Sequence, residues 1–230
     1  MFLLILAAVL LAAGQSAPLA DCGTLTQQLQ IQGRDQFLGR WTYAAESTNI
    51  PGSKMLTKMF VENVWGEVSP ANESDSISVR QLQKMFGSCY SVTSKMTLAN
   101  NTLTMAYPLV ASEVLLTTSC SDCMVLLSNY TIGESTFSGV QLMTRRPKVL
   151  AAEMDEFKRQ VDCLNLPPPA ILDSEKGFCP DDSKDTETTD LTSMIAHSDS
   201  EYMKLFEKLV SSEAGIKTLL GLISHFEPPA

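Results

Sequence analysis

The chain has 230 residues, of which 44% are hydrophobic and 19% charged, and its formal net charge is −9. These values exclude a disordered or collagen-like chain, and the acidic balance argues against nucleic acid as a partner. Both histidines, His197 and His225, lie close to the C-terminus. Histidine-based catalysis and a His-rich metal site are therefore excluded from everything that precedes them.

The N-terminus predicts secretion. Residues 1–13 form an uninterrupted apolar run followed by small residues. The run is shorter than the roughly 20 residues of a membrane span and is typical of a signal peptide, here residues 1–17. The alternative is a retained hydrophobic anchor, since no Lys or Arg precedes the run. Three N-x-S/T sequons, at Asn72, Asn100 and Asn129, predict exposed glycosylation sites on the same secretory route.

The central part of the chain predicts eight short β-strands. Its hydrophobic pattern has period two or is locally apolar, and turn residues interrupt it every few positions. Eight strands joined by tight turns indicate a sandwich or an up-and-down barrel. The predicted strands are Gly39–Ser47, Lys58–Val68, Ser76–Met85, Cys89–Leu98, Thr102–Pro108, Ser112–Thr118, Cys123–Tyr130 and Phe137–Arg145.

The period then changes to that of helices. Apolar residues recur on one helical face between Pro147 and Cys163, and Pro147 suits the first turn because it has no N–H to satisfy. An acidic segment, Asp181–Asp190, follows. Ser198 and Glu201 form a capping-box pattern that opens a second amphipathic segment ending near Phe226. It forms one helix or two short ones, because Ser211, Ser212 and Gly215 weaken its middle. We expect residues 18–180 to form one domain and residues 181–230 to form an appended tail.

The tail helix has two interpretations. It packs on the domain or stays weakly ordered, which we favour, or its apolar face attaches the protein to a lipoprotein or membrane surface.

The segment Phe37-Leu-Gly39-Arg-Trp41-Thr-Tyr43 opens the first strand with a G-x-W motif. Together with eight strands, a following helix and paired cysteines, this motif resembles the lipocalins. Within them, the region Cys22–Cys179 is similar to the branch of alpha-1-acid glycoprotein and apolipoprotein M, to which fish plasma binders of saxitoxin, tetrodotoxin and tributyltin belong. Val161–Pro167 is the most specific part of that similarity.

The resemblance implies an eight-stranded antiparallel up-and-down barrel closed at one end by Gly39, Trp41 and Arg145. Arg146 is the adjacent candidate for the arginine. It also implies the disulfides Cys22–Cys163 and Cys89–Cys179, whereas cysteine arithmetic alone allows 15 connectivities for six cysteines. We favour a local disulfide between Cys120 and Cys123. A redox motif would need a βαβ context, and a zinc site would need two further ligands.

A barrel of this size holds one small ligand. Counting from Trp41 with period two places Tyr43 and Ala45 inside. Glu62 and Glu67 are candidates for holding a positively charged ligand, and a solvated strand face is the alternative. Further candidate wall residues, for each of which simple core packing is an alternative, are Trp65, Tyr90, Met105, Tyr107, Leu116, Leu126 and Met143.

The sequence thus predicts a secreted carrier of small hydrophobic or amphipathic molecules, with no metal, no cofactor and no catalytic residue. Two alternatives remain. One is an immune-modulating or lipoprotein-associated surface protein that acts through the tail helix. The other is a thiol-dependent isomerase, which would require a free cysteine in the barrel.

Overall fold

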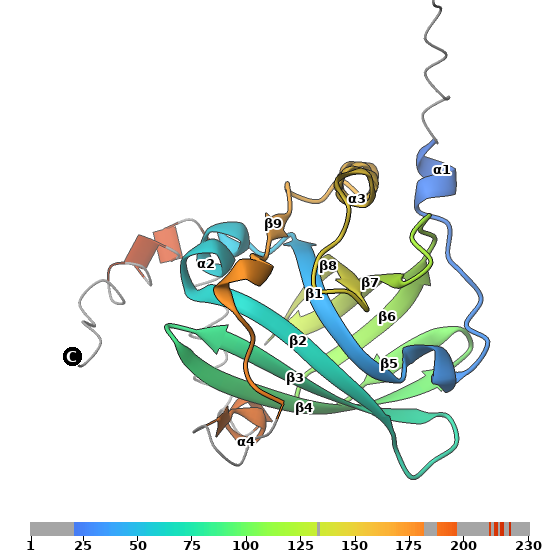
Figure 1. Cartoon of the computed structure of the whole chain (residues 1–230), viewed down its shortest axis with the longest axis horizontal. Helices are drawn as coiled ribbons and strands as arrows, with labels where there is room; N and C mark the ends of the chain where they lie inside the picture. Colours follow the sequence, from blue (N-terminus) through green and yellow to red (C-terminus); the bar gives the residue numbers. More distant parts are fainter. Residues whose placement is uncertain are drawn as a thin grey trace, which may run out of the picture.

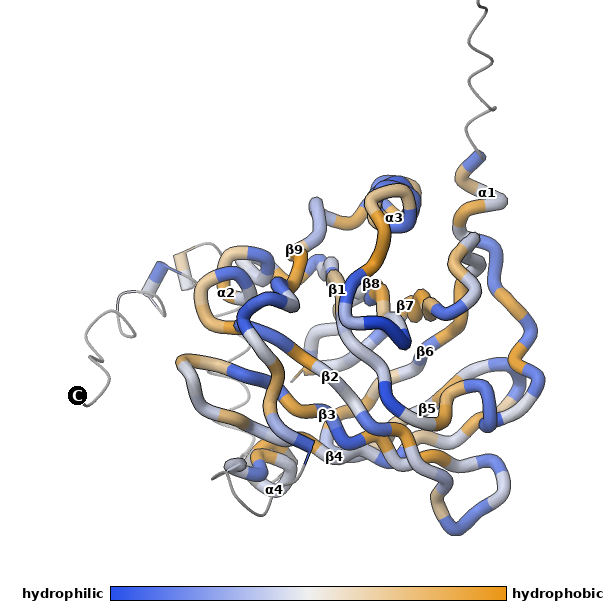
Figure 2. Tube along the Cα trace, viewed as in Figure 1, coloured by the Kyte–Doolittle hydropathy of each residue, from blue (hydrophilic) through white to orange (hydrophobic). Residues whose placement is uncertain are grey.

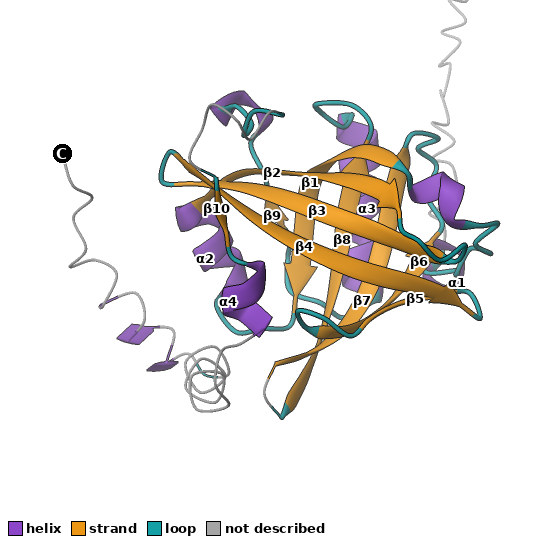
Figure 3. Ribbon diagram, turned by 90° about the horizontal axis from the view of Figure 1, so that it is seen from below, coloured by secondary structure: helices purple, strands orange, loops and turns teal. Residues whose placement is uncertain are grey.

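Eight antiparallel strands close into a barrel in the computed structural model (Figures 1 and 3). The structure describes residues 21–132, 134–181 and 188–196, with six single positions between 212 and 221. Each strand pairs with the next, and β8 returns to β1. The strands are β1 (Gly39–Thr48), β2 (Val61–Pro70), β3 (Ser76–Met85), β4 (Ser88–Ala99), β5 (Thr102–Met105), β6 (Val110–Leu116), β7 (Cys123–Ile132) and β8 (Ser135–Thr144).

The predicted fold class is therefore confirmed, and three predicted boundaries differ from the observed ones by three residues or more. Lys58 belongs to a helix, α2 (Ser53–Phe60), which precedes β2. β5 ends at Met105, before the cis peptide bond between Tyr107 and Pro108. The helix after the barrel, α3 (Ala151–Cys163), starts four residues beyond Pro147, because the Glu153 side chain accepts the Leu150 N–H and fixes the first turn there.

Helix α3 covers one side of the barrel. Its buried side chains Phe157 and Val161 pack on the outward faces of Leu116, Val125 and Leu142. Figure 2 shows that apolar and polar stretches alternate along the strands, as expected where one face of a strand is buried and the other meets solvent. A short helix, α1 (Cys22–Leu25), lies near one end of α3, to which a disulfide joins it.

The chain after α3 straps the outer surface of the barrel. It pairs with β1 through β9 (Ala170–Ile171), forms a turn of 3-10 helix, η2 (Ser174–Lys176), and reaches the disulfide between Cys179 and Cys89. A second 3-10 turn, η1 (Arg34–Phe37), precedes β1.

Part of the predicted acidic linker lies on the barrel. Only the last residues of β4, Met96–Ala99, pair with β5, so the earlier part of this edge of β4 is left without β5 as a partner. The free edge nearer the start of β4 is taken by β10 (Thr189–Asp190), which runs parallel to it and leads into α4 (Thr192–Ala196) beside it (Figure 3). The signal peptide predicted for residues 1–17 and the helix predicted from Ser198 lie outside the described ranges. No described helix has the length and apolar character needed to cross a membrane.

All six cysteines are paired, and the three pairings are those expected. Cys22–Cys163, Cys89–Cys179 and Cys120–Cys123 close segments of 141, 90 and 3 residues. The two long ones tie the N-terminal arm and the strap to the barrel.

Loop length predicts how much each bridge stabilises the protein. Replacing Cys22 and Cys163 by serine should lower the free energy of unfolding by about 5 kcal/mol, and replacing Cys120 and Cys123 by about 2 kcal/mol, because a longer closed loop restricts the unfolded chain more. Chemical denaturation of the two double variants measures both losses, and equal losses would contradict this expectation.

Candidate ligand-binding site

One end of the barrel is closed by a stacked pair. The Arg145 guanidinium lies 3.6 Å from the centre of the Trp41 ring and donates to the carbonyl of Arg40. The Trp41 Nε1–H donates to the carbonyl of Phe37 at 2.7 Å. Gly39 has a φ of 90°, and a Cβ there would come within 3.1 Å of the arginine. The sequence therefore needs glycine, tryptophan and arginine together at this end.

Above this floor lies a cavity of about 670 Å³, part of it open to solvent. Its lower half is apolar, whereas a few polar side chains enter the middle of the barrel. The lining residues are Phe37, Trp41, Tyr43, Gly66, Val68, Ile77, Val79, Gln81, Ser94, Met96, Leu103, Glu113, Met124, Leu126, Gln141 and Met143.

Five of the predicted wall residues belong to the inner side of the barrel. Tyr43, Leu126 and Met143 line the cavity. Met105 packs against the buried cluster around it, without lining it. Tyr90 lies on the same face of β4 as Ser94 and Met96 but nearer the mouth, beyond the cavity lining.

The other three predicted wall residues are misplaced. Trp65 faces outward, where its Nε1–H donates to the carbonyl of Cys179 and the strap covers it. Leu116 is fully buried beneath α3. Tyr107 is 47% exposed in the β5–β6 connection. The outer wall is itself buried under α3 and the strap, so an apolar residue on a strand did not indicate the inside.

A β-bulge in β1 reverses the predicted phase. Tyr43 pairs with Met143, but the register then shifts, so that Ala45 pairs with Leu142 and Glu46 with Gln141. Paired residues share a face of the sheet, and Leu142 faces α3. Ala45 therefore points outward, contrary to the expectation, and Glu46 turns inward.

Two inward carboxylates were missed. Glu113 lies on β6 where the apolar cavity meets a second space of about 480 Å³ nearer the mouth, to which Glu46 contributes. The Thr57 hydroxyl of α2 donates to Glu46 at 2.6 Å, and the Ser128 hydroxyl donates to Glu113 at 3.1 Å. Alternation from Leu115, once known to be inside, would have found Glu113.

The ionisable side chains of this region are acidic groups and tyrosines. Burial raises the pKa of Glu113, and the hydrogen bond from Ser128 offsets this in part. Burial, with the nearby charges of Glu113 and Glu46, also raises the pKa of Tyr43. Neither space is lined by a Lys, Arg or His. The interior therefore presents two carboxyl groups and no protein cation beside them.

The two glutamates singled out from the sequence lie elsewhere. Glu62 sits at the rim, where its carboxylate accepts the Gly87 N–H and pairs with Lys84. Glu67 lines a depression on the outer surface together with Arg40 and Trp65. Neither glutamate lines the cavity. Glu62 lies at the register shift of β2 between Val61 and Asn63. Glu67 lies on the outward face of β2, as Trp65 does.

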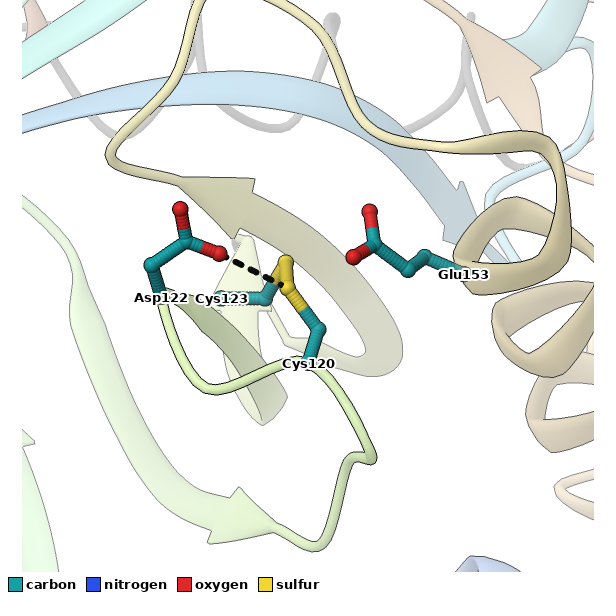
Figure 4. A group of neighbouring side chains, drawn as sticks. All are labelled: Cys120, Asp122, Cys123 and Glu153. Carbon is teal, nitrogen blue, oxygen red and sulfur yellow. Dashed lines mark hydrogen bonds between the residues drawn. A yellow bond between two sulfur atoms is a disulfide. The ribbon is translucent and has the colours of Figure 1, made fainter.

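Four potential metal ligands gather outside the barrel floor, Cys120, Asp122, Cys123 and Glu153 (Figure 4). The two sulfur atoms are bonded to each other. The Arg146 guanidinium pairs with Asp122 at 2.7 Å and with Glu153 at 2.8 Å. This group therefore fastens the end of β8 to α3, and its donor atoms are already engaged.

Comparison with known proteins agrees with this geometry. No protein-family model and no curated protein sequence matches the chain. Among solved structures, that of the siderocalin Ex-FABP, described as functioning through dual ligand specificities, matches with a TM-score of 0.54. The chain has the lipocalin fold. The match covers 60% of this chain and 94% of that one at 15% identity, so the similarity concerns the fold alone.

The raised pKa of Glu113 predicts that this residue lowers the stability of the folded protein in a pH-dependent way. A carboxyl whose folded pKa lies above its unfolded value destabilises the fold as pH rises through the folded value. Glu113→Gln should therefore raise Tm at neutral pH, and the gain should shrink toward zero below about pH 3, where the carboxyl is neutral in both states. Thermal unfolding of the variant and the wild type across this range measures the difference. A gain independent of pH would contradict it.

Proposed function

We propose that this protein is a secreted carrier of small amphipathic molecules that bear a positive charge. The observation that carries the proposal is the pair of inward carboxylates, Glu113 and Glu46, above an apolar cavity whose lining offers them no cation. The apolar part of such a ligand would lie toward Trp41, and its charged group would lie beside Glu113.

The lower cavity supports an apolar ligand body. Val68, Ile77, Leu103 and Met124 supply flexible or branched aliphatic walls around the ring of Trp41. Burial of apolar ligand surface contributes roughly 25 cal/mol per Å², so a modest hydrocarbon group gains useful affinity there. Methionine side chains adapt to ligands of different outline, which favours breadth of binding over strict selectivity.

The carboxylates support a positively charged group. A buried carboxylate is costly in its ionised form unless a cation or several hydrogen-bond donors accompany it. The hydroxyl of Ser128 is one donor to Glu113. An ammonium or guanidinium group beside this carboxylate would supply both charge and donors, and it would favour the ionised form.

Several features favour secretion and binding over catalysis. Asn72, Asn100 and Asn129 all lie exposed, as glycosylation of the three sequons requires. Three disulfides suit an oxidising compartment. Every cysteine is engaged in them, whereas a thiol-dependent isomerase would need one free. The siderocalin with the same fold is described as having two ligand specificities, in line with a binding role for such a barrel.

A matched pair of probes tests the ligand class. Decylamine and decanol share an alkyl chain but differ in charge at neutral pH. We expect decylamine to bind at least about tenfold more tightly, since hydrogen bonds to charged groups contribute about 1.5–3 kcal/mol. Trp41 lines the cavity, so quenching of its fluorescence and native mass spectrometry both report binding.

Two variants separate the inner carboxylate from overall charge. Glu113→Gln should abolish the preference for the amine and leave decanol binding unchanged. Glu67→Gln removes the same charge from the outer surface and should bind both probes as the wild type does. Equal binding of amine and alcohol to the wild type would contradict the proposal.

A further inference from the structure

The mouth of the barrel carries an unusual set of exposed apolar side chains. Because neighbouring strands run in opposite directions, the connections β1–β2, β3–β4, β5–β6 and β7–β8 all lie at the end opposite Trp41. Three of these four connections present large apolar groups to solvent. They are Met55 and Met59 on α2, Phe86 in the β3–β4 turn, and Tyr107 and Val110 between β5 and β6.

Phe86 is the least expected of these residues. Met85 pairs with Ser88, so Phe86 and Gly87 form a two-residue turn, with φ values of 52° and 75°. Two positive φ values define a turn that favours Asn, Asp or Gly in its first position. A bulky residue there is strained, and this one is 63% exposed. The fold gains no turn stability and little burial from it, which points to a role outside the fold.

The turn at the other end of β4 provides an internal comparison. Asn100 and Asn101 connect β4 to β5 with φ values of 49° and 64°. This sequence thus uses the favoured residue type in one tight turn of β4 and phenylalanine in the other. Phe86 also contacts the ring of Phe60, with 5.2 Å between ring centres, so the turn and the end of α2 form one apolar edge.

Helix α2 adds positive charge to this edge. Met55 and Met59 are four residues apart, as are Lys54 and Lys58, so methionines and lysines follow adjacent stripes of the helix. Among the described residues, neither lysine has an ion-pair partner within bonding distance. Thr57 faces inward and donates to Glu46, which fixes the helix on the barrel. The exposed stripes are therefore held toward solvent.

We propose that the barrel mouth docks on a phospholipid surface through α2, Phe86 and the β5–β6 connection. An apolar edge beside an opening suits an interface in which these side chains enter the boundary between headgroups and acyl chains, and it leaves the opening facing the lipid. The Lys54 and Lys58 ammonium groups complement phosphate groups at the depth of the helix. Docking in this orientation would let an amphipathic molecule pass between lipid and barrel without crossing water.

This proposal does not depend on the charge preference of the cavity. It concerns the rim, whose side chains differ from those lining the inner spaces. Glu113→Gln should therefore leave docking unchanged even though it alters ligand binding. A failure of the amine preference and a failure of docking are then separate results.

Sedimentation of the full-length protein with mixed phosphatidylcholine–phosphatidylserine vesicles tests the proposal. We expect Phe86→Asn to weaken vesicle binding by about tenfold or more, since loss of one buried phenylalanine changes a partition constant by at least that factor. Because asparagine suits the turn, Tm of this variant should equal or exceed that of the wild type. Weaker binding by a protein at least as stable excludes unfolding as the cause.

Leu150→Ser is the matched control. Leu150 is 60% exposed, almost as much as Phe86, but it lies beside α3 rather than at the mouth. This variant should bind vesicles as the wild type does, whereas Lys54→Gln with Lys58→Gln should lose the dependence on phosphatidylserine. Unchanged binding of Phe86→Asn, or an equal loss in Leu150→Ser, would overturn the proposal and assign any vesicle contact to another surface or to residues 197–230.

Discussion

Strand β1 joins the two ends of the barrel wall, because it pairs with β2 along its first residues and with β8 along the rest. The side chains that it turns inward therefore contribute to both the floor and the mouth. Trp41 enters at the floor and stacks with Arg145 from the last strand, which closes the bottom. One register shift later in the strand then turns Glu46 toward the mouth. The apolar floor and the acidic middle of the cavity thus depend on one strand and its two neighbours.

The surroundings of Glu113 suit the positively charged ligand that we propose. Its surroundings offer a single hydroxyl donor and otherwise apolar or neutral side chains. The barrel therefore holds this carboxyl in an environment that favours its neutral form. A ligand that brings charge and donors would relieve this cost, so the same feature that weakens the fold strengthens selection of the ligand. Functional sites often retain this kind of local destabilisation.

The mouth of the barrel also contains a residue that is unfavourable for the fold, Phe86. Asn100 and Asn101 show that this chain can build a tight turn from residues that favour it. Phe86 occupies an equivalent position at the opposite end of β4 at a conformational cost. Together with α2 it forms an apolar edge at the mouth of the barrel. In the functions that we propose, the rim and the cavity belong to one route for the ligand, although different residues form them.

The sequence by itself determined the strand count and the helix that follows the barrel. These features follow from local periodicity, which neighbouring residues specify. Resemblance supplied the role of Gly39 and Trp41 at the floor and the two long disulfides. Where both faces of the barrel wall are buried, the local pattern could not predict whether a strand residue points inward or outward, as Trp65 and Leu116 show. Only the tertiary structure decided that Ala45 faces α3 and Glu46 the cavity, because a bulge depends on pairing with a distant strand. The inward place of Glu113 emerged only from the closed barrel, which shows that Leu115, two residues along β6, faces inside.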